Sequence, residues 1–466
     1  MPENARSDRS PSVGPSPAKK DLGEQDQEAL DYDHGTTVPQ GQLARFARFT
    51  GMAAGLAGNV VADGGRELLS GNLTSLQDLL LTPKNAARVA DDLARMRGAA
   101  MKVGQLMSMD GGEFIPPELA DILARLRSQG TPMPAHQLKA LLNNEWGHGW
   151  RRKFKRFEPM PIAAASIGQV HRAMLKDGRQ LAIKVQYPGV RESINSDVDN
   201  IRTLINLSGL LPKGVSLDQF LEEAKKQLHQ EADYDAEGER LTAFREALST
   251  YPDYLVPELV EDITTKSVLS MTYVGGDPVE MLSDADQATR DRVMTLLIRL
   301  LYKELFDFNL MQTDPNFANF RFDRATNKLV LLDFGATREI PNDLAAGYKK
   351  LMTAALTGDK DTLRQTSISM GLITATLFEE NEDLFFELFD LASEAFRYDT
   401  EYDFAGSNLS TRMRDAAVRV DIRRMMGHTP PIDTAFIHRK FGGIFLLGVR
   451  LKAKVNVRRL FEPYVQ

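Results

Sequence analysis

The chain has 466 residues, of which 42% are hydrophobic and 26% charged, so it can bury substantial cores in one large two-lobed unit with extensions. Its formal net charge of −7 argues against broad nucleic-acid binding, which needs a concentrated basic surface, and no nucleic-acid partner is expected. The sequence contains no cysteine, which excludes disulfides, a thiolate nucleophile and cysteine metal sites, and is consistent with a reducing compartment.

Residues 1–40 are rich in Pro, Ser, Gly and charge and lack the apolar segment of a secretory signal, which predicts a disordered tail. Residues 41–155 are predicted to form a helical extension. Within it, apolar positions recur every three or four residues from Val89 to Met107, with Lys102 and Gln105 beside that stripe. A solvated charged face is the simplest interpretation of these two side chains.

The pattern changes to short β-rich segments near residue 156, where a first lobe of residues 156–275 is predicted to begin. Gly168–Met174 and Gln180–Gln186 flank the turn residues Asp177-Gly178 and predict a hairpin. Helical patterns follow at 198–207 and 217–248, and then a strand at 267–274. The second lobe, residues 276–466, is predicted to be mainly helical, interrupted by a strand at 328–333. The longest apolar stretches of the chain, such as Ile444–Val449, are far shorter than the roughly 20 residues that cross a bilayer, so no transmembrane helix is expected.

Three acidic or amide residues of the second lobe carry the most specific chemical signal. Asp314 precedes Asn319 by five residues, and Asp333-Phe-Gly335 follows after a strand. Protein kinases use this order: the first carboxylate orients an attacking hydroxyl or water, and the Asn and the second Asp supply hard oxygen ligands to Mg²⁺. Asp314 and Asp333 taken singly are also typical turn residues. Their combination after the strand lysine of Ala182-Ile-Lys184 favours the kinase-like interpretation.

Glu231, Asp233 and Glu237 are predicted to lie on one helix. Six residues rotate a helical side chain by about 240°, so Glu231 and Glu237 should face different partners. A solvated charged face is the alternative. The seven histidines show no close metal-ligand spacing, and His171, on a predicted strand, is interpreted as a packing or hydrogen-bonding residue.

Four strings together resemble the UbiB family of atypical protein-kinase-like proteins, and in particular its mitochondrial coenzyme-Q branch. They are Lys102-Val-Gly-Gln105, Ala163-Ala-Ala-Ser-Ile-Gly-Gln-Val170, Glu231-Ala-Asp233 and Gln312-Thr-Asp-Pro-Asn-Phe-Ala-Asn319. The resemblance extends from about residue 39 to residue 466. It implies an α+β fold of the bilobal protein-kinase-like type with a family-specific N-terminal helical extension.

The resemblance also assigns roles to individual residues. Lys184 would be the nucleotide lysine with Glu237 as its ion-pair partner, and Asp314 the catalytic-loop aspartate, with Asn319 and Asp333 as metal ligands. The other implied residues are the loop over the nucleotide (Ala163, Ala164, Ala165, Ser166), the adenine-reading hinge strand (Met271, Tyr273, Val274) and a gating group that closes the helical extension over the site (Lys102, Gln105, Glu231, Asp233).

The implied function is a Mg²⁺- and ATP- or ADP-binding atypical kinase, either an ATPase or a small-molecule or lipid phosphotransferase, that supports ubiquinone biosynthesis. Implied partners are a quinone-precursor or lipid ligand, other ubiquinone-biosynthesis enzymes and a peripheral membrane contact. A cytoplasmic location, peripheral at the inner membrane, is expected. A conventional protein kinase is one alternative, and the absence of a glycine-rich loop argues against it. The other is a nucleotide-gated binding protein without turnover, which would not need to keep Asp314, Asn319 and Asp333.

Overall fold

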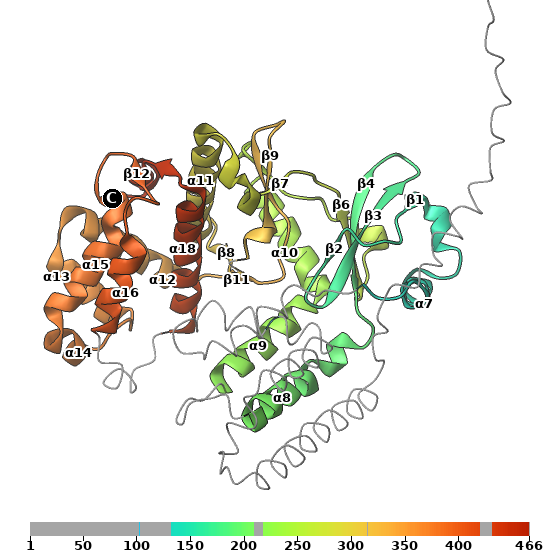
Figure 1. The fold of residues 1–466 in the computed structure, drawn as a ribbon, viewed down its shortest axis with the longest axis horizontal. Helices are drawn as coiled ribbons and strands as arrows, with labels where there is room; N and C mark the ends of the chain where they lie inside the picture. The colour runs from blue at the N-terminus through green and yellow to red at the C-terminus, as the bar shows by residue number, and fades with distance from the viewer. Residues whose placement is uncertain (1–101, 103–131, 209–217, 315, 420–430, 466) are drawn as a thin grey trace, which may run out of the picture.

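The computed structural model describes residues 102, 132–208, 218–314, 316–419 and 431–465. The predicted tail at 1–40, Gln105 and most of the predicted extension at 41–155 lie outside these residues. Figure 1 shows an antiparallel sheet at one end of the molecule and a group of helices at the other, with helix α10 between them.

The first sheet is antiparallel, with the strand order β1-β3-β4-β6 and β2 paired to β3. The predicted hairpin is confirmed: Gly178 takes a left-handed φ of 94° at the turn, and Asp177 Oδ1 accepts the Arg179 N–H at 2.9 Å. The strands are β1 (Phe154–Phe157), β2 (Ala163–Ala164), β3 (Gly168–Leu175), β4 (Gln180–Gln186) and β6 (Val268–Thr272).

Helix α10 packs against this sheet through β6. Gly238 permits a close approach, since a Cβ there would lie 3.2 Å from a Leu259 methyl. Leu241 and Phe244 bury the same helix in the core. The helices of this part are α7 (Ala135–Trp146), α8 (Val190–Ser208), α9 (Asp218–Glu231) and α10 (Tyr234–Ala247), with a 3₁₀ turn at Trp150–Lys153.

The second part, which comprises the described residues from 276 onward and corresponds to the predicted second lobe, is mainly helical, as predicted. Its helices are α11 (Gln287–Tyr302), α12 (Asn342–Thr357), α13 (Lys360–Ser369), α14 (Ala375–Glu380), α15 (Glu382–Arg397), α16 (Leu409–Val418), α18 (Ile432–Leu451) and α19 (Val457–Phe461). Asp286 and Asp359 cap α11 and α13 by accepting backbone N–H groups from Thr289 and Thr362. Among the described residues, no helix combines the length and the apolar character needed to cross a membrane.

The predicted strand at 328–333 is present as β10, which ends at Leu331, and it belongs to a larger set of short strands that the sequence pattern did not predict. A four-stranded sheet has the order β5-β10-β9-β7, and β8 pairs with β11. The bounds are β5 (Tyr254–Leu255), β7 (Asp277–Pro278), β8 (Leu310–Gln312), β9 (Phe320–Asp323), β10 (Lys328–Leu331), β11 (Thr337–Glu339), β12 (Tyr402–Asp403) and β13 (Lys454–Val455). The remaining turns are 3₁₀ at Glu261–Ile263, Val279–Asp284, Phe317–Asn319 and Glu462–Tyr464, and π-helical at Lys303–Asp307.

His171 is a buried structural residue of β3, as the sequence predicted. Its Nδ1 lies 2.9 Å from the carbonyl oxygen of Glu158, and its Nε2 lies 2.8 Å from Gln169 Nε2. The carbonyl can only accept, so Nδ1 carries the proton and Nε2 accepts from Gln169. Gln169 Oε1 in turn accepts the Met133 N–H. A second proton on His171 would face a donor, and burial lowers its pKa from 6.5 to about 4.

This pKa predicts a loss of stability in mild acid. The unfolded chain binds the proton below about pH 6.5 and the folded chain only near pH 4, so the free energy of unfolding should fall as the pH drops between these values. The full contribution is about 3 kcal/mol. Urea unfolding from pH 7 to 5 should show a weaker pH dependence for His171→Gln than for the parent. Equal slopes for the two proteins would contradict the assignment.

Candidate functional site

Lys184 is the central cation of a buried ionic cluster between the two parts of the molecule. It lies on β4, in register with Val170 of β3 and Leu269 of β6, and is only 8% exposed. Its Nζ lies 2.9 Å from Glu237 Oε1 and 3.4 Å from Asp333 Oδ2. Burial alone would lower the pKa of Lys184, but the attraction of Asp333 and Glu237 outweighs burial and raises the pKa well above 10.5. The ammonium therefore remains charged.

Glu237 is buried in the first turn of α10. Burial, the dominant effect, raises the pKa of Glu237 to about 7, although Lys184 acts in the opposite direction. The carboxylate thus depends on its lysine for its charge at neutral pH, and the two side chains form one structural unit.

The expectation that Glu231, Asp233 and Glu237 share one helix is wrong. Helix α9 ends at Glu231, and α10 begins at Tyr234. Asp233 has a non-helical ψ of 83° and caps α10 by accepting the Ala236 N–H at 3.3 Å. Glu231 and Glu237 still face different partners. The reason is that one helix ends and another begins between them, and not that they are rotated along a single helix.

Glu231 connects three segments of the site. Its carboxylate pairs with Lys102 and accepts a hydrogen bond from the Ser166 hydroxyl of the alanine-rich loop. Its side chain also lies beside Gly335, where a Cβ would be 3.6 Å from Glu231 Cγ. Lys102 is 2% exposed and lies 3.9 Å from Asp314 Oδ2. Burial lowers the pKa of Lys102, but Glu231 and Asp314 outweigh burial and raise the pKa above its ordinary value.

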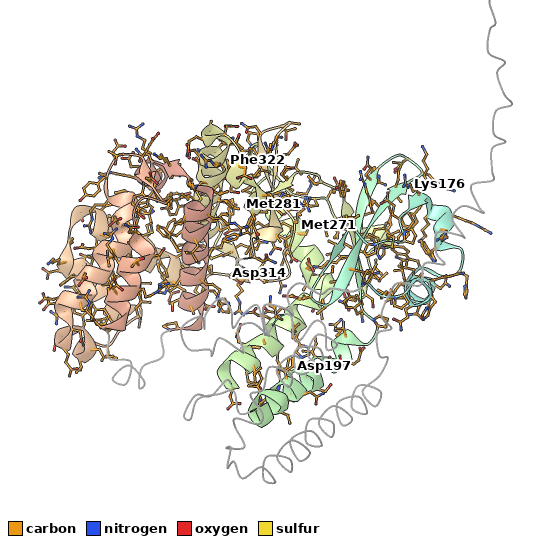
Figure 2. The ribbon with its side chains drawn as sticks, viewed as in Figure 1. Lys176, Asp197, Met271, Met281, Asp314 and Phe322 are labelled. Atoms are coloured by element: carbon orange, nitrogen blue, oxygen red, sulfur yellow. The ribbon has the colours of Figure 1, made fainter. Side chains whose placement is uncertain are left out.

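Asp314 and Asn319 lie on the loop that leaves β8 (Figure 2 labels Asp314). Asp314 Oδ1 accepts the Asn316 N–H at 3.1 Å, which shapes the turn. Asn319 is 8% exposed, and its Nδ2 has no hydrogen-bond partner among the described residues. A buried NH₂ donor that lacks a partner is costly, so Asn319 Nδ2 is suited to a ligand that offers an acceptor, whereas only its Oδ1 could bind a cation.

Asp333 follows β10 and is held by its own turn. Its Oδ1 accepts the Gly335 N–H at 3.0 Å. Burial alone would raise the pKa of Asp333, but Lys184 and the Gly335 N–H overcome burial and hold the pKa below its usual 3.8. Phe334 packs on Phe244 of α10 with ring centroids 5.1 Å apart, and Arg240 donates to the Gly335 carbonyl at 2.9 Å. Asp333 is therefore an ionised, fixed oxygen donor.

The charges of the cluster do not balance. Lys102 and Lys184 supply two positive charges; the four carboxylates are Glu231, Glu237, Asp314 and Asp333. With all groups ionised the described cluster has an excess of two negative charges, which falls to one when Glu237 is protonated. No group of three His, Asp or Glu side chains suited to a metal occurs among the described residues. Mg²⁺ is commonly held by one or two carboxylates together with phosphate oxygens, so Asp333 and Asn319 fit this ion when a nucleotide completes its shell.

The predicted nucleotide-facing residues lie at two opposite edges of the first sheet, on and next to β2 and on and next to β6. Ala163 and Ala164 are exposed on β2, and the Ala165 N–H donates to Gly168 O at 2.8 Å, closing the loop on itself. In the predicted hinge strand, Met271 is buried on β6, and Tyr273 and Val274 follow its end, half-buried. The Tyr273 N–H is donated to Gln180 O at 2.8 Å. Gln105 lies outside the described residues.

Several contacts of the site were missed from the sequence. Arg240, the Ser166–Glu231 hydrogen bond and the side chain of Gln312, which donates to the Asp333 carbonyl, were not assigned. In the sequence, Arg240 is one of several charged residues on a polar helix face, so nothing in the sequence indicated its contact with Gly335. The position of Gln312 in the motif was visible, but its contact partner was not.

Residues 125–367 match the family described as the ABC1 atypical kinase-like domain. The chain is 36% identical over 439 residues to "Atypical kinase COQ8, mitochondrial" of Saccharomyces cerevisiae, covering 94% of this chain and 87% of the yeast protein. It is 37% identical over 429 residues to "Atypical kinase COQ8B, mitochondrial" of Rattus norvegicus, covering 91% and 80%. The solved structure of the Rv3197–erythromycin complex from Mycobacterium tuberculosis is similar, with a TM-score of 0.57 and 25% identity over 82% of this chain and 96% of that chain. The predicted bilobal protein-kinase-like fold is confirmed by these matches.

Proposed function

Because this chain belongs to the ABC1 atypical kinase-like family, the UbiB family that its motifs predicted, we propose that it binds Mg²⁺ with ATP or ADP and acts as an ATPase or a small-molecule phosphotransferase. The observation that carries the proposal is the buried Lys184–Glu237 pair beside Asp333, in a cluster with excess negative charge. A divalent cation and the phosphates of a nucleotide together complete this arrangement.

Each residue of the cluster has a role in the proposal. The Lys184 ammonium, held by Glu237, binds phosphate oxygens, and Asp333 and Asn319 hold Mg²⁺. The bound ion would neutralise charge on the phosphates. Asp314 orients the attacking oxygen of water or of a hydroxyl acceptor. That oxygen forms the new bond to the γ-phosphorus as the bond to the ADP oxygen breaks, and the attacking group's proton passes to Asp314 or to solvent.

Residues at the two edge strands β2 and β6 of the first sheet hold the rest of the nucleotide in this proposal. Met271, Tyr273 and Val274 would contact adenine, with the Tyr273 N–H already donated within the protein. The loop Ala163, Ala164, Ala165 and Ser166 would cover the phosphates. Its hydrogen bond from Ser166 to Glu231 links the loop to the segment of Lys102.

Lys102 argues for a small acceptor. A protein substrate whose hydroxyl approached Asp314 would have to displace the buried Lys102, which lies 3.9 Å from that carboxylate. Water or a small lipid-like hydroxyl needs less room. We therefore assign Lys102, Glu231 and the cap Asp233 to gating, together with Gln105, and favour hydrolysis or a small acceptor over a conventional protein kinase.

We further propose that the reaction supports coenzyme Q biosynthesis. The relatives named COQ8 support this assignment. The corresponding ligand is a quinone precursor or lipid, and the partners are other enzymes of the route and a membrane surface. The cytoplasmic location expected from the sequence remains a prediction.

Phosphate release from the purified full chain tests the function. We expect Mg²⁺-dependent release from ATP that increases with a phenolic quinone-precursor mimic or with vesicles. Nucleotide binding without release under every one of these conditions would instead favour the nucleotide-gated binding protein.

The alanine-rich loop gives a specificity prediction. Glycine at position 165 reaches backbone conformations closed to alanine, so Ala165→Gly should let the loop approach the terminal phosphate differently. A backbone change of roughly 0.5–1 kcal/mol corresponds to a change of about two- to fivefold in the ratio of ATP to ADP affinity. Titrations of both nucleotides measure this ratio, with Ala325→Gly, in the exposed turn after β9, as the control. An unchanged ratio in Ala165→Gly would make the loop a scaffold only.

A further inference from the structure

A second buried ion pair lies in the C-terminal part, outside the cluster described above. Lys440 of α18 and Glu304 of the π-helical turn Lys303–Asp307 bring Nζ and Oε2 to 3.0 Å, with side-chain exposures of 3% and 0%. The two residues are 136 positions apart in the chain. π-Helical turns within helices are rare and often occur at functional sites.

The pair holds the backbone of one residue, Gln312, from both sides. Lys440 Nζ donates to the carbonyl oxygen of Gln312 at 2.8 Å. The N–H of the same residue donates to the Glu304 carboxylate. Gln312 is the last residue of β8, fully buried, and two positions before Asp314. The ion pair therefore fixes the backbone immediately before the catalytic loop.

The side chain of Gln312 links this fixed backbone to Asp333, the proposed metal ligand. Gln312 Nε2 donates to the main-chain carbonyl of Asp333. Its strand pairs with β11 through Gln312 and Thr337, and Thr313 Oγ1 donates to Ala336 O at 2.6 Å. A continuous set of hydrogen bonds thus runs from α18 to the backbone of Asp333.

Stability alone is a weak explanation for the pair. Removing two charges from water is costly, and well-packed apolar side chains at such positions are often equally stabilising. The pair adds hydrogen bonds of defined geometry. The Lys440 ammonium binds the carbonyl oxygen of Gln312, and the Glu304 carboxylate binds its backbone N–H. Apolar side chains cannot do this.

We propose that Lys440 and Glu304 are positioning residues of the magnesium site, and that Gln312 transmits their effect to Asp333. The inference rests on the proposed function, since it concerns the same Mg²⁺-nucleotide site. None of the three side chains needs to touch the nucleotide.

The first test removes the Lys440–Glu304 ion pair and the hydrogen bond to the Gln312 carbonyl, and it leaves no unpaired buried charge. In the double variant Lys440→Met with Glu304→Gln, the glutamine still accepts the Gln312 N–H, but the Gln312 carbonyl loses its donor. Residues that orient metal ligands typically change metal affinity about 10- to 100-fold. The Mg²⁺ concentration for half-maximal thermal stabilisation by ATP should rise by this factor, and the stabilisation by ATP without Mg²⁺ should stay at the parent value.

Lys303→Met is the matched control. Lys303 lies on the same π-helical turn and is mostly buried, but it pairs with Asp307 at 3.2 Å and stacks over Tyr251. This variant should lose stability and keep the Mg²⁺ requirement of the parent. An equal rise in the Mg²⁺ requirement for the control and the double variant would overturn the proposal, because a general loss of stability would then explain both.

The second test concerns the transmitting side chain. Gln312→Leu removes the donor to Asp333 O and keeps the backbone hydrogen bonds to the ion pair, so it should raise the Mg²⁺ requirement as the double variant does. Gln312→His can donate a ring N–H to the same carbonyl and should restore most of the parent behaviour. Leucine and histidine variants with the same Mg²⁺ requirement would overturn the role of Gln312.

Hydrogen exchange separates this inference from the proposed function, because it needs no nucleotide. Amides of 310–314 and 334–337 should exchange at least about tenfold faster in the double variant than in Lys303→Met, since about 1.4 kcal/mol of local opening free energy changes exchange tenfold. Unchanged exchange would overturn the positioning role. If exchange accelerates but the parent shows no Mg²⁺-dependent nucleotide stabilisation, the proposed function fails, and the pair positions the loop for another ligand.

Discussion

Asp333→Asn is expected to reduce Mg²⁺-dependent phosphate release by at least about 100-fold. The substitution replaces an ionised oxygen donor by a neutral amide, and metal stabilisation of developing charge contributes several kcal/mol, of which each 1.4 kcal/mol is a factor of ten. The depressed pKa of Asp333 shows that its ionised form is the favoured one in the folded protein. Asparagine has almost the same shape, so the Gly335 N–H keeps its acceptor and the fold should persist.

Asp323→Asn is the matched control for this substitution. Asp323 also ends a strand of the same sheet, and it accepts hydrogen bonds from its own turn at Ala325 and Thr326. Its loss should leave Mg²⁺-dependent release near the parent rate. Asp333→Asn that retains full release, with folding verified by thermal unfolding, would remove Asp333 from the metal site.

Lys184→Ala should have the second large effect, on both stability and binding. It leaves Glu237 buried without its cation, and breaking one side of a buried pair typically costs about 3–5 kcal/mol. It should also abolish the rise in melting temperature with ATP, because that rise reports binding to the folded state. Urea unfolding measures the loss of stability, and thermal unfolding with and without ATP measures the change in melting temperature.

Two further variants separate the effect on stability from the effect on nucleotide binding. Lys176→Ala removes an exposed lysine from the tip of the β3–β4 hairpin (Figure 2) and should change neither quantity. Adding Glu237→Gln to Lys184→Ala removes the lone carboxylate, so stability should recover in part while the nucleotide effect stays absent. Recovery of the nucleotide effect in that double variant would show that Lys184 does not bind phosphate.

The structure brings together several side chains that the sequence singled out, but their arrangement could not be read from the sequence. Motif order singled out Lys184, Asp314, Asn319 and Asp333 because the chemistry of phosphate and Mg²⁺ restricts which residue types serve, and their roles stay predictions. The structure brings Lys184 to Asp333 across 149 positions. Such long-range proximity is not encoded in local periodicity, so only the motif order could suggest it.

The errors have local physical causes. Helical spacing continues through residues 231–237, yet Asp233 competes for backbone N–H groups as an N-cap and ends the run. Strands β8 and β11 have three residues each, which is too short for an alternating pattern to be recognised. The Lys440–Glu304 pair appears in the sequence as two ordinary charges, and its burial depends on how α18 packs in the completed fold.

The most direct test of the central claim is calorimetric titration of the full chain with ATP, in the presence of Mg²⁺ and with EDTA. A buried cluster with excess negative charge should bind the nucleotide saturably at one class of sites, and more tightly with Mg²⁺, because the cation offsets both the carboxylates and the phosphates. Asp333→Asn should remove the difference between the two conditions. Saturable binding that is equally tight in EDTA, or no saturable binding in either condition, would contradict a magnesium–nucleotide site at Lys184, Asn319 and Asp333.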